Sequence, residues 1–481
     1  MHTPFFPQLR ARFAACRRRL QQVRPRRLDQ LEHLFGQYLP PGLLAQADEG
    51  PNSRERIFSR RRTFWGFLYQ VLHPGCPCRT VVRHVRAFFK VHRLASVDKG
   101  TSAYCQARLR LPLDNLTRLR HASAARGEQL LPAQRDWFGL HPKVIDGTTV
   151  TAPDTPKNQR AYPQSRSQKP GCGFPLLKLV GVFSLATGVL LDYVKGNKHQ
   201  HELALLRKLL DQFKPKDLAL ADRGFCCYVL IALFLARQVQ SLFRLHQRRA
   251  ADLRRGQRLG KNDRLFTWHK PAVKPRYLPN TLWKRVPETL AVRVLRFTLA
   301  VPGFRPEGIT LVTTLTDARA YPAHELARLY ARRWRIELWF RDLKTTLGME
   351  TLQCQSPRML HKELEMYFIA YNLLRALMVE AAALHDVPVE RISFKGTVDS
   401  TVEYSLALVE ARSQKAQREL VADLLAVIAE DALPERPGRC EPRAVKRRPK
   451  PYPLLNKPRD QFKDIPHRSR YRKNNPRKSR A

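Results

Sequence analysis

The chain has 481 residues, of which 43% are hydrophobic, so it is long enough for about two to four domains with sizeable cores. Its 87 lysines and arginines outnumber its 41 acidic residues and give a formal net charge of +46, which favours a polyanionic partner, above all nucleic acid. The length and the large apolar runs disfavour a ribosomal or histone-like protein, which would usually be shorter and less apolar.

The cysteines and the apolar runs indicate the compartment. Nine cysteines are scattered without a CxxC pair, and the Cys76-Pro77-Cys78 spacing is too tight for a zinc knuckle. An odd, unpatterned count is typical of free thiols in a reducing compartment. The N-terminus lacks a continuous apolar segment, and the longest apolar run, residues 225–236, is too short to cross a bilayer. We therefore expect a soluble intracellular protein without a membrane partner.

Residues 1–138 are predicted to form a helical DNA-binding domain. Amphipathic or basic helical patterns occupy five segments of it, namely 27–39, 56–72, 80–94, 103–111 and 113–122. Basic helices in this arrangement can bind DNA, whereas the alternative is a helical bundle with a solvated surface. The overall charge favours DNA binding.

The pattern changes near residue 139, where the first part of an α/β domain (139–246) is predicted. The strand KVIDGTTV is followed by a β-hairpin with an Ala-Thr-Gly turn, then by a helix, a buried strand, a buried helix and a further strand. The predicted ranges of these elements are 143–150, 175–196, 201–213, 218–222, 225–237 and 239–245. Their order, with an antiparallel start, indicates an α/β sheet.

The rest of the chain divides into four predicted segments. Residues 247–320 are basic and strand-like, and we interpret them as a β-rich insertion that includes a hairpin over 292–317. Residues 321–390 return to the sheet domain with two long helices, and 391–435 form a C-terminal helical region. The tail, 436–481, carries 17 lysines and arginines against 3 acidic residues and is predicted to be disordered.

One stretch of the first long helix combines several functional side chains. Tyr330, Arg333, Glu337 and Lys344 follow the spacing Y-x2-R-x3-E-x6-K, which places them within an arc of roughly 60° on an α-helix. The apolar stripe of the same helix lies about 80° away. It consists of Leu329, Ile336, Phe340, Leu343 and Leu347. Glu337 should therefore lie at the edge of the buried face, held rigidly but open to a substrate.

Three carboxylates suit phosphodiester chemistry. Asp146 lies within a strand, Asp222 ends a strand and precedes Arg-Gly-Phe, and Glu337 lies on the helix. Phosphoryl transfer without a covalent enzyme intermediate uses two divalent ions, one for the attacking oxygen and one for the leaving oxygen. Hard oxygen ligands favour Mg²⁺ or Mn²⁺. Each residue alone is weak evidence, because an aspartate at a strand end is usually a turn or cap residue and the helix stripe can be a solvated face.

Together these motifs resemble those of the DDE transposases of the bacterial insertion-sequence class that bear the YREK signature, the insertion-sequence four-like family. The resemblance covers residues 141 to 380. It implies an RNase H-like core with a β-rich insertion between Asp222 and Glu337, which are 115 positions apart (337 minus 222). It also implies that Asp146, Asp222 and Glu337 are the ligands of two Mg²⁺ or Mn²⁺ ions, and that Tyr330, Arg333 and Lys344 hold DNA phosphates.

The resemblance further implies a cut-and-paste transposase that cleaves the ends of an insertion sequence and joins the 3′-OH to target DNA. Its expected partners are double-stranded DNA, at terminal inverted repeats and at the target, and a second copy of the chain in the synaptic complex. Its expected location is the bacterial cytoplasm, on the nucleoid. Trp268 and Trp283 in the insertion are candidates for stacking on a DNA base, although a packed core position is the more common role for tryptophan.

Three alternatives remain open from the residues alone. The first is an RNase H-like DNA nuclease without strand transfer, which the three carboxylates cannot separate from a transposase. The second is a catalytically inactive DNA-binding derivative, against which the complete set of Asp146, Asp222, Glu337 and the helix stripe argues. The third is a general nucleic-acid-binding protein.

Overall fold

The computed structural model describes residues 31–434 with short gaps, and three residues of the tail. The gaps are 33, 46–55, 92–93, 95, 132–135, 247–248, 250, 300–306 and 412, and the tail residues are 457, 458 and 461. Most of the predicted disordered tail, and residues 27–30 and 33 of the predicted helix 27–39, therefore lie outside the described residues. The described part of the predicted helix 27–39 is helical and ends in a 3-10 turn, Gly36–Tyr38.

The N-terminal part is helical, as predicted. Its helices are α3 (Arg60–Leu72), α4 (Cys78–Val91), α5 (Ser102–Arg110) and α6 (Leu113–Gln129). The start of α3 follows from its cap, because the Ser59 side chain accepts a hydrogen bond from the backbone N–H of Arg62. Whether these helices bind DNA stays a prediction.

A nine-stranded mixed sheet occupies the middle of the described chain, and most of its strands were predicted from alternating apolar residues. The strands are β1 (His141–Thr151), β2 (Leu176–Ser184), β3 (Leu190–Asn197), β4 (Asp217–Ala221), β5 (Gln240–Arg244), β6 (Gln257–Gly260), β7 (Asp263–His269), β8 (Thr289–Leu299) and β9 (Glu307–Thr313). Their order across the sheet is β3-β2-β1-β4-β5-β9-β8-β7-β6. The protein is therefore a mixed α/β protein with N-terminal helices.

The first five strands form the part of the sheet that carries Asp146 and precedes Asp222. Strands β2 and β3 form the predicted hairpin, and Gly188 in its turn has a φ of +71°, a conformation that favours glycine. Strand β1 pairs antiparallel with β2 on one side and parallel with β4 on the other. Strand β5 continues the parallel pairing.

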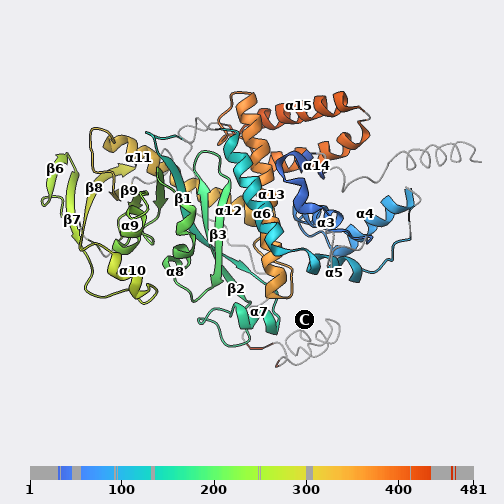
Figure 1. Ribbon diagram of the computed structural model, residues 1–481, viewed down its shortest axis with the longest axis horizontal. Helices are drawn as coiled ribbons and strands as arrows, with labels where there is room; N and C mark the ends of the chain where they lie inside the picture. Colours follow the sequence, from blue (N-terminus) through green and yellow to red (C-terminus); the bar gives the residue numbers. More distant parts are fainter. Residues whose placement is uncertain are drawn as a thin grey trace, which may run out of the picture.

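The predicted β-rich insertion extends this sheet. Strand β9 pairs antiparallel with β5, and β8, β7 and β6 follow in turn toward the far edge, which is the left edge in Figure 1. A buried ion pair fixes two of these strands, since Arg293 Nη2 on β8 lies 2.6 Å from Asp263 Oδ2 on β7. The insertion is thus joined to the core by backbone hydrogen bonds.

Alternate strand residues face two separate cores. On β4, Leu218 and Leu220 belong to the core that contains α13, whereas Ala219 and Ala221 belong to the core beneath α8, α9 and α10. The helices not yet placed are α7 (Pro156–Ala161), α8 (Glu202–Leu206), α9 (Tyr228–Leu235) and α10 (Asn280–Arg285), and a 3-10 segment, Arg207–Gln212, follows α8. This alternation decides which face each strand carboxylate occupies.

The first of the two long helices predicted for 321–390 is not uniformly α-helical. It consists of α11 (Ala323–Ala331), a 3-10 turn (Arg332–Trp334), α12 (Arg335–Arg341) and a π-helical segment, Asp342–Thr346. The uniform 100° spacing assumed for the Tyr330 to Lys344 stripe is therefore wrong at two places, because a 3-10 turn winds more tightly and a π turn more loosely. The predicted apolar stripe is nevertheless buried throughout.

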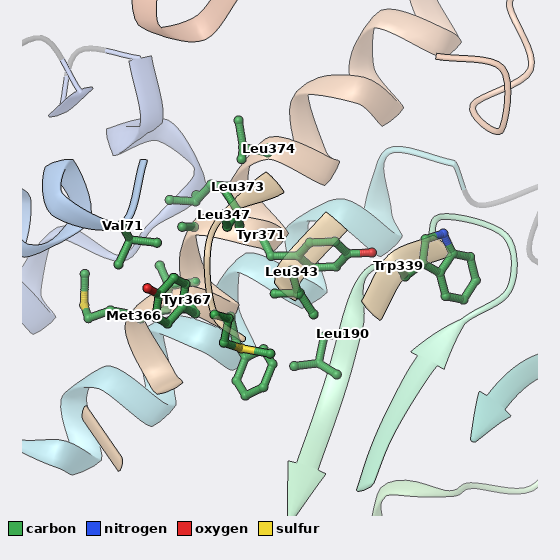
Figure 2. Close-up of a cluster of buried hydrophobic side chains, with 14 of the residues drawn as sticks. Val71, Leu190, Trp339, Leu343, Leu347, Met366, Tyr367, Tyr371, Leu373 and Leu374 are labelled. Carbon is green, nitrogen blue, oxygen red and sulfur yellow. The ribbon is translucent and has the colours of Figure 1, made fainter. Parts of the chain in front are cut away.

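Helix α13 (Pro357–Leu384) is the central support of the molecule. It runs beside α6, between the sheet and the N-terminal helices (Figure 1). Figure 2 shows its Tyr371, Leu373 and Leu374 among buried side chains that include Leu343 from the π segment and Leu190 from β3. By length and composition α13 passes for a membrane span, but most of it is buried inside this protein. Its apolar residues are therefore core residues.

The C-terminal helical region contains α14 (Phe394–Glu410) and α15 (Gln414–Glu430). Both begin at serine caps, since Ser393 and Ser413 accept hydrogen bonds from backbone N–H groups of the first turn. Both pack against α13 or against each other, as Figure 1 shows in orange and red. The limits of the predicted domains stay predictions.

A buried ionic network joins α6, β3 and α13. Arg120 is 3% exposed, and it donates through Nε to Glu365 Oε2 at 2.9 Å and through Nη2 to Asp192 Oδ1 at 2.8 Å. The Tyr193 hydroxyl donates to the second oxygen of Glu365 at 3.0 Å. Asp192 thus has a structural role, since it neutralises a cation where the helices meet the sheet.

Replacing Arg120 with methionine is expected to lower the free energy of unfolding by about 3–5 kcal/mol, because Glu365 and Asp192 would be left buried and unpaired. Urea unfolding followed by circular dichroism measures this change. The matched control is Arg61→Met, which removes a 64%-exposed partner of Glu32 and should change stability by less than about 1 kcal/mol. Equal losses in the two variants would contradict a stabilising role of the network.

Candidate active site

The parallel pairing of β1 with β4 brings the two aspartates together. Ile145 lies opposite Ala221, so Asp146 on β1 and Asp222 at the end of β4 are neighbours across the ladder. Each carboxylate is oriented by a local backbone hydrogen bond. The N–H of Gly147 donates to Asp146 Oδ1 at 2.8 Å, and that of Gly224 donates to Asp222 Oδ1 at 2.8 Å. The glycines that follow both aspartates thus help to orient them.

Glu337 approaches the same place from α12, which packs against β1. Strand alternation turns Asp146 to the face of Val144, the face that α11 to α13 cover. The guanidinium of Arg333 connects the two carboxylates, with Nη1 3.9 Å from Asp146 Oδ2 and Nη2 3.6 Å from Glu337 Oε1. The structure therefore places Asp146, Asp222 and Glu337 around one site, with Arg333 between the strand and the helix.

Tyr330 points into the protein. It is 5% exposed, and its hydroxyl donates to the carbonyl oxygen of Ala221 at 3.4 Å, directly before Asp222. Burial is the main cause that raises the pKa of Tyr330 to about 12, and nearby Asp222 contributes. Its ring also lies beneath the Arg333 guanidinium, 5.7 Å from the ring centroid. In this structure Tyr330 anchors α11 to the end of β4 and is not turned toward solvent.

Burial is also the main cause that raises the pKa of Asp146, to about 6. The hydrogen bond from Gly147 and the charge of Arg333 lower it, whereas the negative charges of Asp222 and Glu202 raise it. Asp146 is thus a buried carboxylate with further negative charges close to it. A divalent cation would relieve this repulsion.

Glu202 is a neighbour of the site that the sequence did not identify. It lies in the first turn of α8, and its Oε1 is 2.8 Å from the point that a Cβ atom on Gly147 would occupy. A side chain at position 147 would therefore displace the Glu202 carboxylate from this place. A weak contact of 3.9 Å connects Glu202 Oε1 to Lys178 Nζ. In the sequence His199-Gln200-His201-Glu202 is typical of a helix start, and only the tertiary structure reveals that Glu202 lies close to Asp146.

The remaining predicted residues lie around or away from this centre. Lys344 is in the π segment, where Nζ lies 3.8 Å from Glu350 Oε1. Trp268 on β7 and Trp283 on α10 are partly buried against the second core, and each carries a cation over its ring. The structure thus does not bring the two tryptophans to the carboxylates, and their stacking on DNA stays a prediction.

The donor set fits two hard cations. Asp146, Asp222 and Glu337 supply only carboxylate oxygens, which Mg²⁺ and Mn²⁺ prefer. The raised pKa of Asp146 shows that burial disfavours its charged form, which a bound cation would stabilise. Among the described residues no three acidic, histidine or cysteine side chains converge closely enough to hold an ion, because Glu337 is 63% exposed and Arg333 separates it from Asp146. Binding would therefore require Glu337 and Arg333 to rotate.

Comparison with known proteins identifies this arrangement. Residues 141–373, from the start of β1 into α13, match the transposase DDE domain family. Transposase InsG of insertion sequence element IS4 from Escherichia coli is 27% identical over 429 residues, which cover 88% of this chain and 94% of InsG. The chain belongs to the DDE transposases of the IS4 family. The resemblance seen in the sequence motifs is confirmed.

The relation extends beyond the catalytic segment. InsG is similar to this transposase over nearly its whole length, including the N-terminal helices and the C-terminal region. Among solved structures, the piggyBac transposase synaptic complex with hairpin DNA is a remote match, with 8% identity, a TM-score of 0.41 and 85% of each chain covered.

Replacing Asp146 with asparagine is expected to stabilise the metal-free transposase by about 3 kcal/mol at pH 7. The folded-state pKa of about 6 exceeds the unfolded value of about 3.9, so the wild type loses stability as the pH rises between these values. Because asparagine does not ionise, the variant avoids this loss of stability. Its gain in the free energy of unfolding over the wild type should therefore be complete above pH 6 and absent below pH 4.

Thermal unfolding in EDTA across this pH range measures the effect. The control is Asp211→Asn, since Asp211 has a 90%-exposed side chain and should show no such profile. A gain in stability that persists at pH 3.5, or that is absent at pH 7, would show that the surroundings of Asp146 do not disfavour its ionised carboxylate.

Proposed function

We propose that this transposase cleaves the ends of its insertion sequence and joins the freed 3′-OH to target DNA at one site, built on Asp146, Asp222 and Glu337. The observation that carries the proposal is the parallel register of β1 and β4, which sets the two aspartates side by side beneath α12. The order β3-β2-β1-β4-β5 supports an RNase H-like core, with β6 to β9 as its insertion.

The three carboxylates would hold a pair of Mg²⁺ or Mn²⁺ ions. When bound, the ions activate the attacking water or 3′-OH and stabilise the leaving oxygen. The rigid β-ladder fixes Asp146 and Asp222 relative to each other, whereas the exposed side chain of Glu337 is free to turn inward. Cleavage and joining are both in-line phosphoryl transfers, so one such site serves both steps.

The cations of the YREK segment supply the DNA contacts in this proposal. Arg333 is 15% exposed and already contacts Asp146 and Glu337. Once the carboxylates are neutralised, its planar guanidinium can turn to the scissile strand and grip a phosphate with two hydrogen bonds. Lys344, with its weak link to Glu350, offers a point charge further along the same helix. Tyr330 supports both by holding α11 against β4.

The partners follow from the reaction and the charge. Joining two element ends to one target requires two active sites, so we propose a homodimer in the synaptic complex. Double-stranded DNA at the terminal repeats and at the target is the polyanion that a net charge of +46 requires. The bacterial cytoplasm, on the nucleoid, is the proposed location.

Replacing Glu337 with glutamine is expected to abolish cleavage of DNA that carries the element end, because loss of one ligand costs about 3 kcal/mol or more, at least about 100-fold in rate. DNA binding should persist, since the change removes a negative charge. Strand cleavage in Mg²⁺ and fluorescence anisotropy measure the two properties. The control is Glu325→Gln on the neighbouring α11, where Glu325 pairs with Arg328.

The products of this assay separate the alternatives. Strand-transfer products with the wild type support a transposase, whereas cleavage without joining would leave an RNase H-like nuclease. Binding without cleavage would identify an inactive DNA-binding derivative. Full activity of the Glu337→Gln variant would show that Glu337 is not a metal ligand of the active site.

Replacing Lys344 with glutamine is expected to weaken binding to the element end and to reduce the slope of log affinity against log salt by about 0.9, the value of one lost phosphate contact. The titration is done without divalent ions, so that cleavage does not interfere. Lys415→Gln on α15 is the control, because Lys415 is 87% exposed and distant in sequence from the site. Equal slopes for wild type and Lys344→Gln would exclude the phosphate contact.

A further inference from the structure

A buried cation in the N-terminal helices has sulfur atoms as its partners. Arg108 on α5 is 8% exposed, and among the described residues no carboxylate forms an ion pair with it. It donates instead through Nη1 to Cys78 Sγ at 3.2 Å and through Nη2 to Cys354 Sγ at 3.1 Å, while its Nε is buried without a partner. A buried guanidinium needs a counter-charge, and besides the more distant carboxylate of Glu363, a thiolate at its sulfur partners can supply it.

Cys78 is the thiol best placed to be that thiolate. It is the first residue of α4, where the helix dipole favours a negative charge. A hydrogen bond from the Cys105 thiol lowers the pKa of Cys78 well below the usual thiol range, and the charge of Arg108 lowers it further, against the opposing effect of burial. The same hydrogen bond is the main cause that raises the pKa of Cys105, so Cys105 keeps its proton. Both residues are partly accessible to solvent.

We propose that Cys78 and Cys105 form a peroxide-sensitive dithiol that closes into a disulfide between α4 and α5. The Cys78 thiolate attacks one oxygen of hydrogen peroxide, forms a sulfenic acid and releases hydroxide. The Cys105 sulfur then attacks the sulfenic sulfur, its proton leaves with the hydroxyl group as water, and the S–S bond forms. Two thiols are oxidised and one peroxide is reduced to water. Thiol reductants reverse the reaction, as expected in a reducing compartment.

The position of this pair links it to the catalytic half. Arg108 holds Cys78 with one nitrogen and Cys354 with the other, and Cys354 lies just before α13. The backbone N–H groups of Gln353 and Cys354 both donate to Glu363 on that helix. Oxidation removes the thiolate from Arg108 and so leaves the cation with weaker partners at the junction of the N-terminal helices with α13.

The cluster is arranged for thiol chemistry and not for a metal. Cys76, Cys78, Cys105 and Cys354 lie near one another, yet in the described part of the chain no three such side chains converge on a metal position. Burial raises the pKa of Cys354, and it also raises that of Cys226 on the other side of the molecule, to about 12. Cys78 alone in this cluster combines a helix N-terminus, a guanidinium and a neighbouring thiol.

The test exposes the full-length protein, under native conditions at neutral pH, to one equivalent of hydrogen peroxide. Free thiols are then blocked, and the unreduced digest is analysed by mass spectrometry. The expected result is one major cross-link between the Cys78 and Cys105 peptides, a loss of two hydrogen atoms from the intact mass, and full reversal by dithiothreitol. Cys172→Ser, which changes a thiol in a distant loop, should leave this result unaltered.

Two further variants separate the roles of the sulfurs. In Cys105→Ser, Cys78 should accumulate as a sulfenic acid that dimedone traps, whereas Cys78→Ser should abolish reaction at Cys105. Oxidation of Cys78 no faster than Cys172 in the wild type, or a predominant cross-link to another cysteine, would overturn the proposal. These readouts need no DNA and no metal ion, so their failure is distinguishable from failure of the proposed transposition activity.

Discussion

The parallel pairing of β1 with β4 is the constraint on which the site depends. A shift of one residue in this ladder would turn Asp146 to the opposite face, away from α12, and would move it out of line with Asp222. The register is fixed because Val144 and Ile145 fill two different cores on the two faces of the sheet. Hydrophobic burial on both sides thus sets the position of the charged group between them.

The helical side of the site, which carries Glu337, is supported by α13. Helix α13 is buried along most of its length and supports the π segment that follows α12, as the position of Leu343 beside Tyr371 in Figure 2 shows. Glu337 is therefore carried on a firmly packed helix although its own side chain is exposed. This combination of fixed backbone and mobile carboxylate is suited to a site that closes only around bound ions and DNA.

Much of this arrangement could be predicted from sequence, since alternating apolar residues identify the strands of Asp146 and Asp222 and the stripe around Ile336 identifies the helix of Glu337. Local pattern does not reveal contacts between distant segments. The approach of Glu202 to Gly147 depends on how α8 packs over β1. The inward position of Tyr330 depends on the end of β4, and the sequence pattern does not reveal the 3-10 turn or the π segment of its helix.

The most direct test of the central claim is anomalous scattering from Mn²⁺ in crystals of the transposase bound to DNA of its element end. The account predicts two manganese peaks about 3.5–4 Å apart, contacted by the carboxylates of Asp146, Asp222 and Glu337. It also predicts that Arg333 has left the space between Asp146 and Glu337. Manganese bound elsewhere, with none in contact with Asp146 and Asp222, would contradict the assignment of these residues as the catalytic centre.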